Sequence, residues 1–534
     1  MISIKEQTKP PRTGRAAVLV AIGILFSRLF GLIRLRVFNH YFGLTAPADA
    51  FTAGFRIPNF LSNLFGEGAL SASFIPVYAA LVARGEQKQA DRVAGAVMAL
   101  LALAVSMLVL IGVLATPFLI DLIAPGFQGS TRELTIRIVR ILFPGMGLMV
   151  MSAWCLGVLN SHHKFFISYA APVAWNIVMI ITLVVFGRRG TALPQLAIIL
   201  AWGSVAGSAV MFMVQLPAVW SVAPDIRPVF DTASDHVRTV VRNFGPVLVS
   251  RGVVQLSSYI DQIIATWLPV GAPAAMGSAQ IVQLLPVSLF GISVSAAELP
   301  AMSGAVSVDP AGFDALRRRL ESGLRQIAFF VVPSAVAFAA LGDVIAAALF
   351  QTGRFQHADT LVVWGILAGA AVGLLATTLG RLYSSTYYAL RDTRTPLNYA
   401  LIRVALTTVL GYVCAMRLPG WIGIDGIWGT AGLTASAGVA GWVEMLMLRR
   451  TLNTRIGRTG LPASFVMKLW ASALTGAAAA WLIKLALPTL HPIVSGLLIL
   501  GPYGVVYFAV TFALRVPEGL TVMRRIPGVG SRNF

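Results

Sequence analysis

The sequence predicts an all-α protein that crosses a membrane many times, with about 14 transmembrane helices. The chain has 534 residues, of which 57% are hydrophobic and only 12% are charged, and its mean hydropathy is +0.79. Soluble domains carry roughly twice that charged fraction. A helix needs roughly 20 apolar residues to span a bilayer, and the chain offers about fourteen such segments joined by short loops.

The expected membrane-spanning segments follow one another closely along the chain. Several exceed the minimum length, which is typical of tilted helices or of helix ends that project past the hydrocarbon layer. In chain order we expect them at residues 16–42, 49–83, 92–124, 133–160, 166–187, 193–220, 239–268, 274–303, 323–350, 360–388, 395–416, 426–448, 464–486 and 491–514.

The distribution of positive charge indicates the topology. The formal net charge is +20, and Lys and Arg gather in the two tails and in alternate loops, although Arg188 and Arg189 break this pattern. Such an excess is typical of cytoplasmic loops, so both termini are expected in the cytoplasm and no nucleic-acid partner is expected. Cys155 and Cys414 fall inside apolar segments and are interpreted as packing residues, without a disulfide or a metal site.

A weak internal repeat divides the chain into two halves. Five ordered pairs of residues, among them Arg28 with Arg251 and Pro76 with Pro300, are separated by 223 to 228 positions. A duplication of six helices gives two lobes of the same orientation around a central cavity. We therefore expect a cytoplasmic tail at 1–15, an N-lobe of helices 1–6 at 16–222, a C-lobe of helices 7–12 at 223–451, two further helices at 452–515 and a cytoplasmic tail at 516–534.

The first two expected helices carry charges where a lipid-spanning helix normally has none. Asp49, Arg56 and Asn63 lie seven residues apart and Glu67 follows four later, so on a helix they form one polar stripe. Helix 7 has a corresponding polar face that begins at Arg251. Ionisable groups at membrane depth are costly unless they face a water-filled cavity or each other. This pattern therefore predicts a site.

Arginine dominates the predicted site. Guanidinium groups grip phosphate oxygens bidentately and keep their charge when partly desolvated, so an anionic substrate that carries a diphosphate is expected. The expected headgroup-binding residues are Arg28, Arg34, Arg56 and Arg251. The expected cavity and gating carboxylates are Asp49, Glu67 and Asp261, and the other polar cavity residues are Asn59, Asn63, Gln255, Ser258 and Gln280.

Signals of a soluble enzyme are missing from the sequence. It has no P-loop, no nucleotide-binding glycine fingerprint and no paired His or Cys ligands. We therefore expect a transporter without catalytic residues, cofactor or metal. The membrane potential acts on a cationic cavity, so coupling to it is one possibility, and coupling to Na⁺ or H⁺ is another.

Structural roles remain open for many of these charges. A carboxylate at position 49 also suits the dipole at the start of a helix, and intramembrane structural ion pairs are the alternative explanation of Arg28, Arg56, Glu67 and Arg251. Arg36 can extend to the membrane interface. We interpret Arg381, Arg403, Glu444, Lys468 and Lys484 as structural, and we expect His162 and His163 to be solvated in a cytoplasmic loop.

The chain contains several distinctive motifs, which are SRLFGLIR (Ser27–Arg34), ADAF (Ala48–Phe51), FRIPN (Phe55–Asn59), FGEGALSASFIPV (Phe65–Val77), APGF (Ala124–Phe127), LFQTGRF (Leu349–Phe355) and LRDTRTP (Leu390–Pro396). Together these motifs resemble the signature of the MurJ/MviN family. The resemblance implies a flippase in the bacterial inner membrane for lipid II, the undecaprenyl-diphosphate-linked peptidoglycan precursor. It also implies the fold of the multidrug/oligosaccharidyl-lipid/polysaccharide exporter superfamily, in which two extra helices form a groove for the polyprenyl tail. Membrane lipids and cell-wall synthesis proteins are the expected partners.

The chain departs from the family pattern at two places. The family's helix-1 arginines fall on Arg28 and Arg34 and its helix-2 aspartate on Asp49, but Ser62 stands where many members have arginine. Gln280 and Ile281 stand where helix 8 often has an Asp–Arg pair. We hypothesise that Arg56 and Arg251 compensate. The alternatives are a flippase for another polyprenyl-diphosphate-linked glycan, a drug/cation antiporter of the same superfamily, and a membrane scaffold without transport activity.

Overall fold

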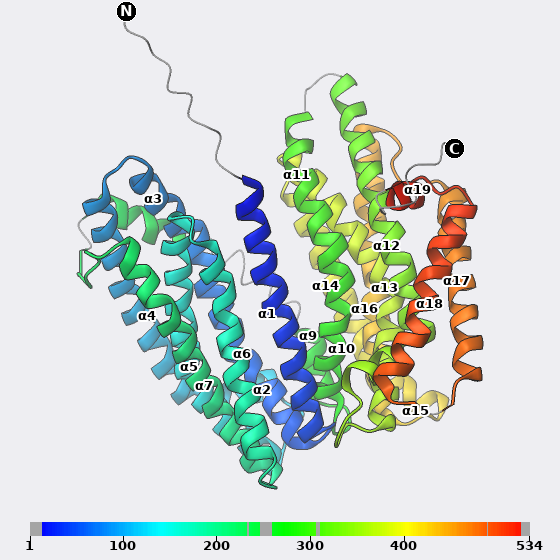
Figure 1. Ribbon diagram of the computed structural model, residues 1–534, viewed down its shortest axis with the longest axis horizontal. Coiled ribbons are helices and arrows are strands. Elements are labelled where there is room, and N and C mark those ends of the chain that lie inside the picture. The colour runs from blue at the N-terminus through cyan, green and yellow to red at the C-terminus, as the bar shows by residue number, and fades with distance from the viewer. Residues whose placement is uncertain (1–12, 232–233, 246–258, 306–309, 489, 525–534) are drawn as a thin grey trace, which may run out of the picture. The chain divides into compact units, whose positions relative to one another are not determined.

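The computed structural model is helical throughout the residues that it describes, which are 13–231, 234–245, 259–305, 310–488 and 490–524 (Figure 1). The chain divides into two compact units. The first unit comprises Met1–Tyr41 and Ala50–Ser258, and the second comprises Phe42–Asp49 and Tyr259–Phe534. The all-α polytopic class predicted from composition is confirmed.

The first unit is a bundle organised around α5. This helix packs against α4, α7 and the π-helical segment η1, and α6 packs against α7 (Figure 1). Helix α2, the π-helical segment η1 and helix α3 follow one another without a break and form one candidate membrane span, Ala46–Ala83. The elements are α1 (Thr13–Phe42), α2 (Ala46–Asn63), η1 (Leu64–Leu70), α3 (Ser71–Ala83), α4 (Gln87–Ile123), α5 (Gly129–Ser161), α6 (Phe165–Gly187) and α7 (Leu193–Val222).

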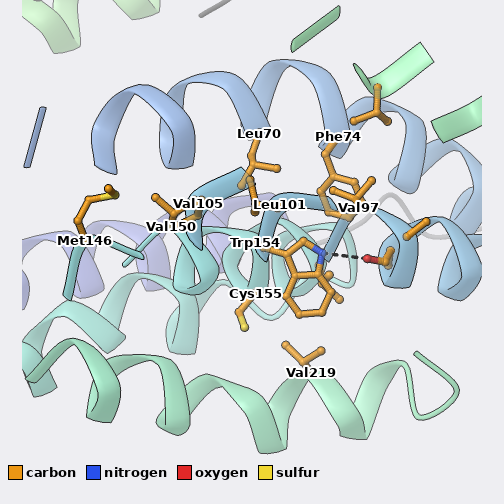
Figure 2. Close-up of a cluster of buried hydrophobic side chains, with 14 of the residues drawn as sticks. Leu70, Phe74, Val97, Leu101, Val105, Met146, Val150, Trp154, Cys155 and Val219 are labelled. Carbon is orange, nitrogen blue, oxygen red and sulfur yellow. Dashed lines mark hydrogen bonds between the residues drawn. The ribbon is translucent and has the colours of Figure 1, made fainter. Parts of the chain in front are cut away.

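The core of the first unit surrounds Trp154 (Figure 2). The indole is 1% exposed, and its N–H donates a hydrogen bond to the carbonyl of Ala94, 3.2 Å away. Phe74 and Val150 are fully buried in the same cluster. Truncating a buried tryptophan costs about 3–5 kcal/mol. The Trp154 contact therefore fixes α5 against α4.

The second unit is built around α12, α13 and α16. Helix α13 packs against both of the others, and α17 and α18 pack against each other and against α12 (Figure 1). The elements are α9 (Ile260–Ala265), α10 (Ala272–Pro286), η2 (Val287–Ile292), α11 (Ser293–Ala305), α12 (Pro310–Phe350), α13 (His357–Ala389), α14 (Arg394–Tyr412), η3 (Val413–Arg417), α15 (Leu418–Ile422), η4 (Gly426–Trp428), α16 (Gly429–Ile456), α17 (Ala463–Ala486), α18 (Pro492–Ala513) and α19 (Pro517–Arg524).

Glycines bring α13 and α16 into backbone contact. A Cβ added at Gly438 would lie 2.6 Å from the backbone nitrogen of Gly373, and one added at Gly441 would lie 2.7 Å from a methyl carbon of Thr377. Small residues at a helix interface allow this close approach inside a membrane, where lipid tails compete equally for apolar surface. The seam fixes the relative position of the two helices along most of their length.

A kink in α12 is held by two tryptophans. Leu341 has non-helical dihedral angles, φ −128° and ψ 17°, which interrupts the helical hydrogen bonds there. The indole N–H of Trp364 donates to the carbonyl of Ala339 at 2.9 Å, and that of Trp481 donates to the carbonyl of Ala340 at 3.0 Å. These bonds satisfy carbonyls that a kink would otherwise leave unpaired in an apolar environment.

The expected spans agree with the structure over most of the chain. Among the described residues, 12 helices are long and apolar enough to cross a membrane, and each overlaps one expected span. The expected span 16–42 corresponds to α1, and part of the span 239–268 lies outside the described residues. The total of 14 is therefore approximate. The expected lobe boundaries at 222 and 451 stay predictions.

Two π-helical segments occupy corresponding places in the two halves. Val287, where η2 begins, lies 223 positions after Leu64, where η1 begins. Each segment also brings a glycine against a neighbouring helix, since a Cβ on Gly66 would lie 3.0 Å from the Cβ of Ala153. A Cβ on Gly291 would meet Thr378 in the same way. These equivalent contacts support the internal repeat that residue spacing predicted.

Candidate functional site

Arg34 is the predicted binding arginine that the structure positions most fully. Its Nε donates to Oδ1 of Asn176 on α6 at 2.9 Å, and its guanidinium carbon lies 5.0 Å from the ring centroid of Trp175. Asn176 is oriented in turn by its own donation to the carbonyl of Pro172. Because the bond to Asn176 uses one of five guanidinium N–H groups, the others can serve an anion. Among the side chains that the structure describes, no carboxylate forms an ion pair with Arg34, so the arginine is held in place with its charge available.

A row of aromatic rings joins α1, α2 and α6 beside this arginine. The ring centroids of Phe38 and Phe51 lie 5.5 Å apart, those of Phe51 and Phe55 6.0 Å, and those of Phe55 and Trp175 5.7 Å. Sequence reasoning missed Trp175 and Asn176. The available signal was an Asn next to a Trp within the otherwise apolar span 166–187.

The other predicted residues of the first unit lie on α1 and α2. Arg28 is exposed, whereas Arg56, Asn59 and Asn63 are half-buried on α2 at positions that share one helix face. Ser62, which stands where many relatives were expected to have arginine, is buried, with 9% exposure. The stripe predicted along α2 thus has the spacing and exposure of a polar face. Its role in binding stays a prediction.

Asp49 caps a helix that is distant in the sequence. Its carboxylate is 2% exposed and accepts hydrogen bonds from the backbone nitrogens of Gly271, at 2.6 Å, and Ala274, at 2.9 Å. These amides belong to the first turn of α10, which otherwise has no partner for them. Asp49 also lies in the first turn of its own α2, as the helix-dipole alternative expects, so its carboxylate stands at the start of two helices.

Residues 42–49 also pack against the LFQTGRF turn. Thr352 and Phe355 exchange backbone hydrogen bonds of 3.2 and 3.0 Å across this turn. Gly43 has φ +58°, and a Cβ there would lie 2.8 Å from the carbonyl oxygen of Arg354. Gly271, with φ +96°, leaves similar room for Leu44. Two of the sequence motifs and the Asp49 cap therefore form one assembly in the second unit.

The structure describes only some of the remaining predicted residues. Asp261 is half-buried in the first turn of α9, and Gln280 is exposed on α10. The structure describes the backbone of Glu67 within η1 but not its side chain, and Arg251, Gln255 and Ser258 lie outside the described residues. The roles assigned to all of these residues stay predictions.

The expectation that His162 is solvated is wrong. The side chain is half-buried at the end of α5, where its Nε2 lies 2.9 Å from the hydroxyl of Tyr78, which is fully buried on α3. Burial lowers the pKa of His162 despite the nearby carboxylate of Asp91. Helices α3, α4 and α5 come together at this point. The polar loop sequence alone could not indicate this packing.

An apolar groove of about 290 Å³ lies on the second unit between α10, α12 and α18. Its lining includes Val282, Leu285, Phe338 and Tyr503. The Tyr503 hydroxyl donates to the carbonyl of Pro333 at 2.6 Å, so the polar end of that ring is satisfied and its apolar face lines the groove. The surface has the chemistry to hold hydrocarbon chains.

Comparisons with solved structures identify the fold. The structure titled "Lipid II flippase MurJ, inward closed conformation" superposes with a TM-score of 0.74 at 24% identity, covering 93% of this chain and all of that one. An inward-facing multidrug resistance MATE transporter of the MOP superfamily gives a TM-score of 0.65 at 17% identity, covering 82% of this chain and 98% of that one. At these identities the likeness shows the shared fold alone.

Comparisons of sequence identify the family. The family model for the "Lipid II flippase MurJ" matches residues 38–501. The lipid II flippase MurJ of Burkholderia cenocepacia is 30% identical over 448 residues, which cover 83% of this chain and 84% of that protein. The probable lipid II flippase MurJ of Rhizobium meliloti is 30% identical over 441 residues, covering 81% of this chain and 79% of that protein. The chain therefore belongs to the lipid II flippase MurJ family.

Proposed function

We propose that this protein is a flippase that moves lipid II from the inner to the outer leaflet of the bacterial inner membrane. The observation that carries the proposal is the family match over residues 38–501, supported by relatives that share about a third of the residues over most of both chains. The guanidinium of Arg34, held by Asn176, supplies the chemistry that a diphosphate headgroup requires.

In this proposal the headgroup enters a cationic cavity, in which each group of residues has a separate role. Arg34, fixed by Asn176, provides a preorganised fork, and Arg28, Arg56 and Arg251 add charge around the diphosphate. The carboxylates of Glu67 and Asp261 hold the arginines when no substrate is bound. The polyprenyl tail stays in the bilayer along α17 and α18, whose outer faces expose large apolar side chains such as Leu482 and Leu497.

Transport proceeds by alternating access in this proposal. A ligand shifts a conformational equilibrium only through different affinities for the two states. The π-helical segments η1 and η2 supply flexible points in corresponding helices, because a π-bulge is less regularly hydrogen-bonded than the α-helix around it. The membrane potential, at about 2.3 kcal/mol per charge per 100 mV, or a Na⁺ or H⁺ gradient, supplies the driving force.

We further propose that both termini lie in the cytoplasm. The alternation of basic and uncharged loops supports this orientation. Interactions with membrane lipids and with proteins of cell-wall synthesis are part of the same proposal. Neither nucleic acid nor a bound cofactor has a role in it.

The second candidate is a flippase for another glycan linked to a polyprenyl diphosphate. It is favoured by Ser62, which is buried, and by Gln280, which is exposed, since both stand where cationic or charged residues were expected. A drug/cation antiporter would need cavity carboxylates to outnumber arginines, and a scaffold would tolerate neutral residues at the arginine positions.

The proposal is tested by complementation. A bacterium depleted of its own lipid II flippase would express this chain, and survival and colicin-accessible lipid II in the outer leaflet would be followed together. Arg34→Gln and Arg251→Ala should abolish rescue at matched membrane abundance. Arg458→Gln, which changes an exposed arginine between α16 and α17, is the matched control and should rescue fully.

The outcomes separate the candidates. Rescue that the two cavity variants lose supports lipid II transport through these arginines. Absence of rescue by abundant, correctly inserted protein would refute lipid II as the substrate and favour the other glycan. Rescue that survives both variants would refute the arginine site while leaving transport intact.

A further inference from the structure

A second cluster of arginines lies in the second unit, away from the residues considered so far. Arg403, in the middle of α14, forms an ion pair with Glu444 on α16, with Nε and Oε2 3.1 Å apart. Arg381 on α13 interacts electrostatically with both of these groups. Two guanidinium groups thus share one carboxylate, and the cluster carries a net charge of +1.

The cluster is deep within its helices. Arg381 lies eight residues before Ala389, where α13 ends, and Arg403 lies nine residues after Arg394, where α14 begins. At 1.5 Å per residue these positions are roughly 12–14 Å from the helix ends that the loop 390–393 joins. The charges therefore lie well inside the membrane-spanning length, where an uncompensated cation is costly.

The positive charge that remains beyond the Arg403–Glu444 ion pair belongs to Arg381. Glu444 is 16% exposed and Arg403 36%, so their ion pair is partly sheltered. Arg381 is exposed, and among the described residues its guanidinium makes no direct hydrogen bond or ion pair with a protein group. Tyr388, which is 48% exposed, lies two helical turns further along α13.

The backbone holds this arrangement rigidly. The glycine seam between α13 and α16 reaches the residues next to the charges, where a Cβ on Gly380 would lie 3.8 Å from the Cβ of Met445. In the sequence, Arg381 directly follows Gly380, and Met445 directly follows Glu444. The packing of α13 against α16 therefore places Glu444 and Arg381 near each other. Their side chains lose little conformational entropy when a ligand binds.

We propose that Arg381 and Arg403 form a second anion-binding site, for a phosphate group of the substrate headgroup, with Glu444 as an internal counter-ion that the ligand displaces. Because no described protein group hydrogen-bonds or ion-pairs directly with the Arg381 guanidinium, water or an anion must solvate it at this depth. Two planar forks beside one another suit the oxygens of a phosphate or diphosphate. The proposal rests on the proposed function, which supplies a lipid diphosphate as the occupant.

The two members of the ion pair respond differently in this proposal. Arg403→Gln and Arg381→Gln each remove an attractive charge and should weaken binding about tenfold or more. Glu444→Gln removes the competitor of the ligand and should strengthen binding. A purely structural ion pair predicts instead that Arg403→Gln and Glu444→Gln both destabilise the protein and change binding in the same direction.

The experiment measures equilibrium binding to the full chain in nanodiscs. The two probes are a polyprenyl diphosphate incorporated in the bilayer and inorganic diphosphate in solution. Arg458→Gln is the matched control and should bind as the wild type does. Size-exclusion profiles and thermal unfolding establish that each variant is folded, and Arg381→Gln, whose side chain is exposed, keeps the test decisive if Arg403→Gln fails to fold.

Each outcome decides one question. Opposite effects of the arginine and Glu444 substitutions support the site, with the responsive probe showing whether a lipid or a free diphosphate occupies it. Lipid probe binding that none of the three substitutions alters would overturn this inference and leave the proposed function standing. Binding of inorganic diphosphate alone, still dependent on Arg381, would uphold the anion site and count against the lipid flippase. No binding of either probe would overturn the inference.

Discussion

Substitution of Asp49 should loosen the start of α10. The carboxylate accepts two backbone hydrogen bonds, from Gly271 at 2.6 Å and Ala274 at 2.9 Å, while it is 2% exposed. A hydrogen bond to a charged group contributes about 1.5–3 kcal/mol. Asp49→Asn turns one acceptor into a donor and should therefore lose one bond. Asp49→Ala loses both bonds, roughly 3–6 kcal/mol, and the charge–dipole interaction as well.

Hydrogen–deuterium exchange of the two amides measures this loss directly, because it reports local opening free energies. A loss of 1.5–3 kcal/mol should speed exchange at Gly271 and Ala274 roughly tenfold to a hundredfold in Asp49→Asn. The control is Asp425→Ala, which removes a cap that accepts from the backbone nitrogen of Ile427 at 3.0 Å, and it should affect only its own peptide. Unchanged exchange at both α10 amides in Asp49→Ala would refute the capping role.

Three other side chains give testable expectations. Hydrogen bonds at the start of α14, with help from an ion pair to α16, lower the pKa of Asp392 from its ordinary value of 3.8 to about 2. Its contribution to stability is therefore full above about pH 4 and is lost as the pH falls to about 2, so thermal unfolding of Asp392→Asn should depend less on pH there. Gly438→Ala would place a Cβ 2.6 Å from the backbone nitrogen of Gly373 and should reduce the yield of folded protein in size-exclusion chromatography. Arg34→Lys keeps the charge but loses the planar fork, so flipping should fall about tenfold at unchanged abundance.

Much of the fold was predictable because membrane insertion is governed by local composition. A run of apolar residues must form a helix in lipid, where each backbone group needs a partner within its own segment. For this reason twelve expected spans overlap helices of the described part of the chain. The kink at Leu341 was not predictable, because its cause is the position of Trp364 and Trp481 on other helices rather than a proline at that point.

The sequence predicts which types of residue form the candidate site, but not which groups these residues contact. An arginine within an apolar segment signals a site by its cost alone, and Arg34 has the predicted location on α1. That it is held by Asn176 follows from the packing of α1 against α6, 142 residues away in the sequence. Arg403 and Glu444 were interpreted as structural because neither belongs to a polar stripe of its own helix.

The sequence by itself determined the class of protein, the approximate spans, the cationic character of the site and the family resemblance, because hydropathy and short motifs are properties of neighbouring residues. Only the tertiary structure decided which charges meet. Asp49 could be recognised as a charged residue at a helix start, but the amides that it caps belong to a helix more than 220 residues later in the chain. Hydrogen bonds and ion pairs act over about 3 Å, and which groups come that close depends on how the helices pack.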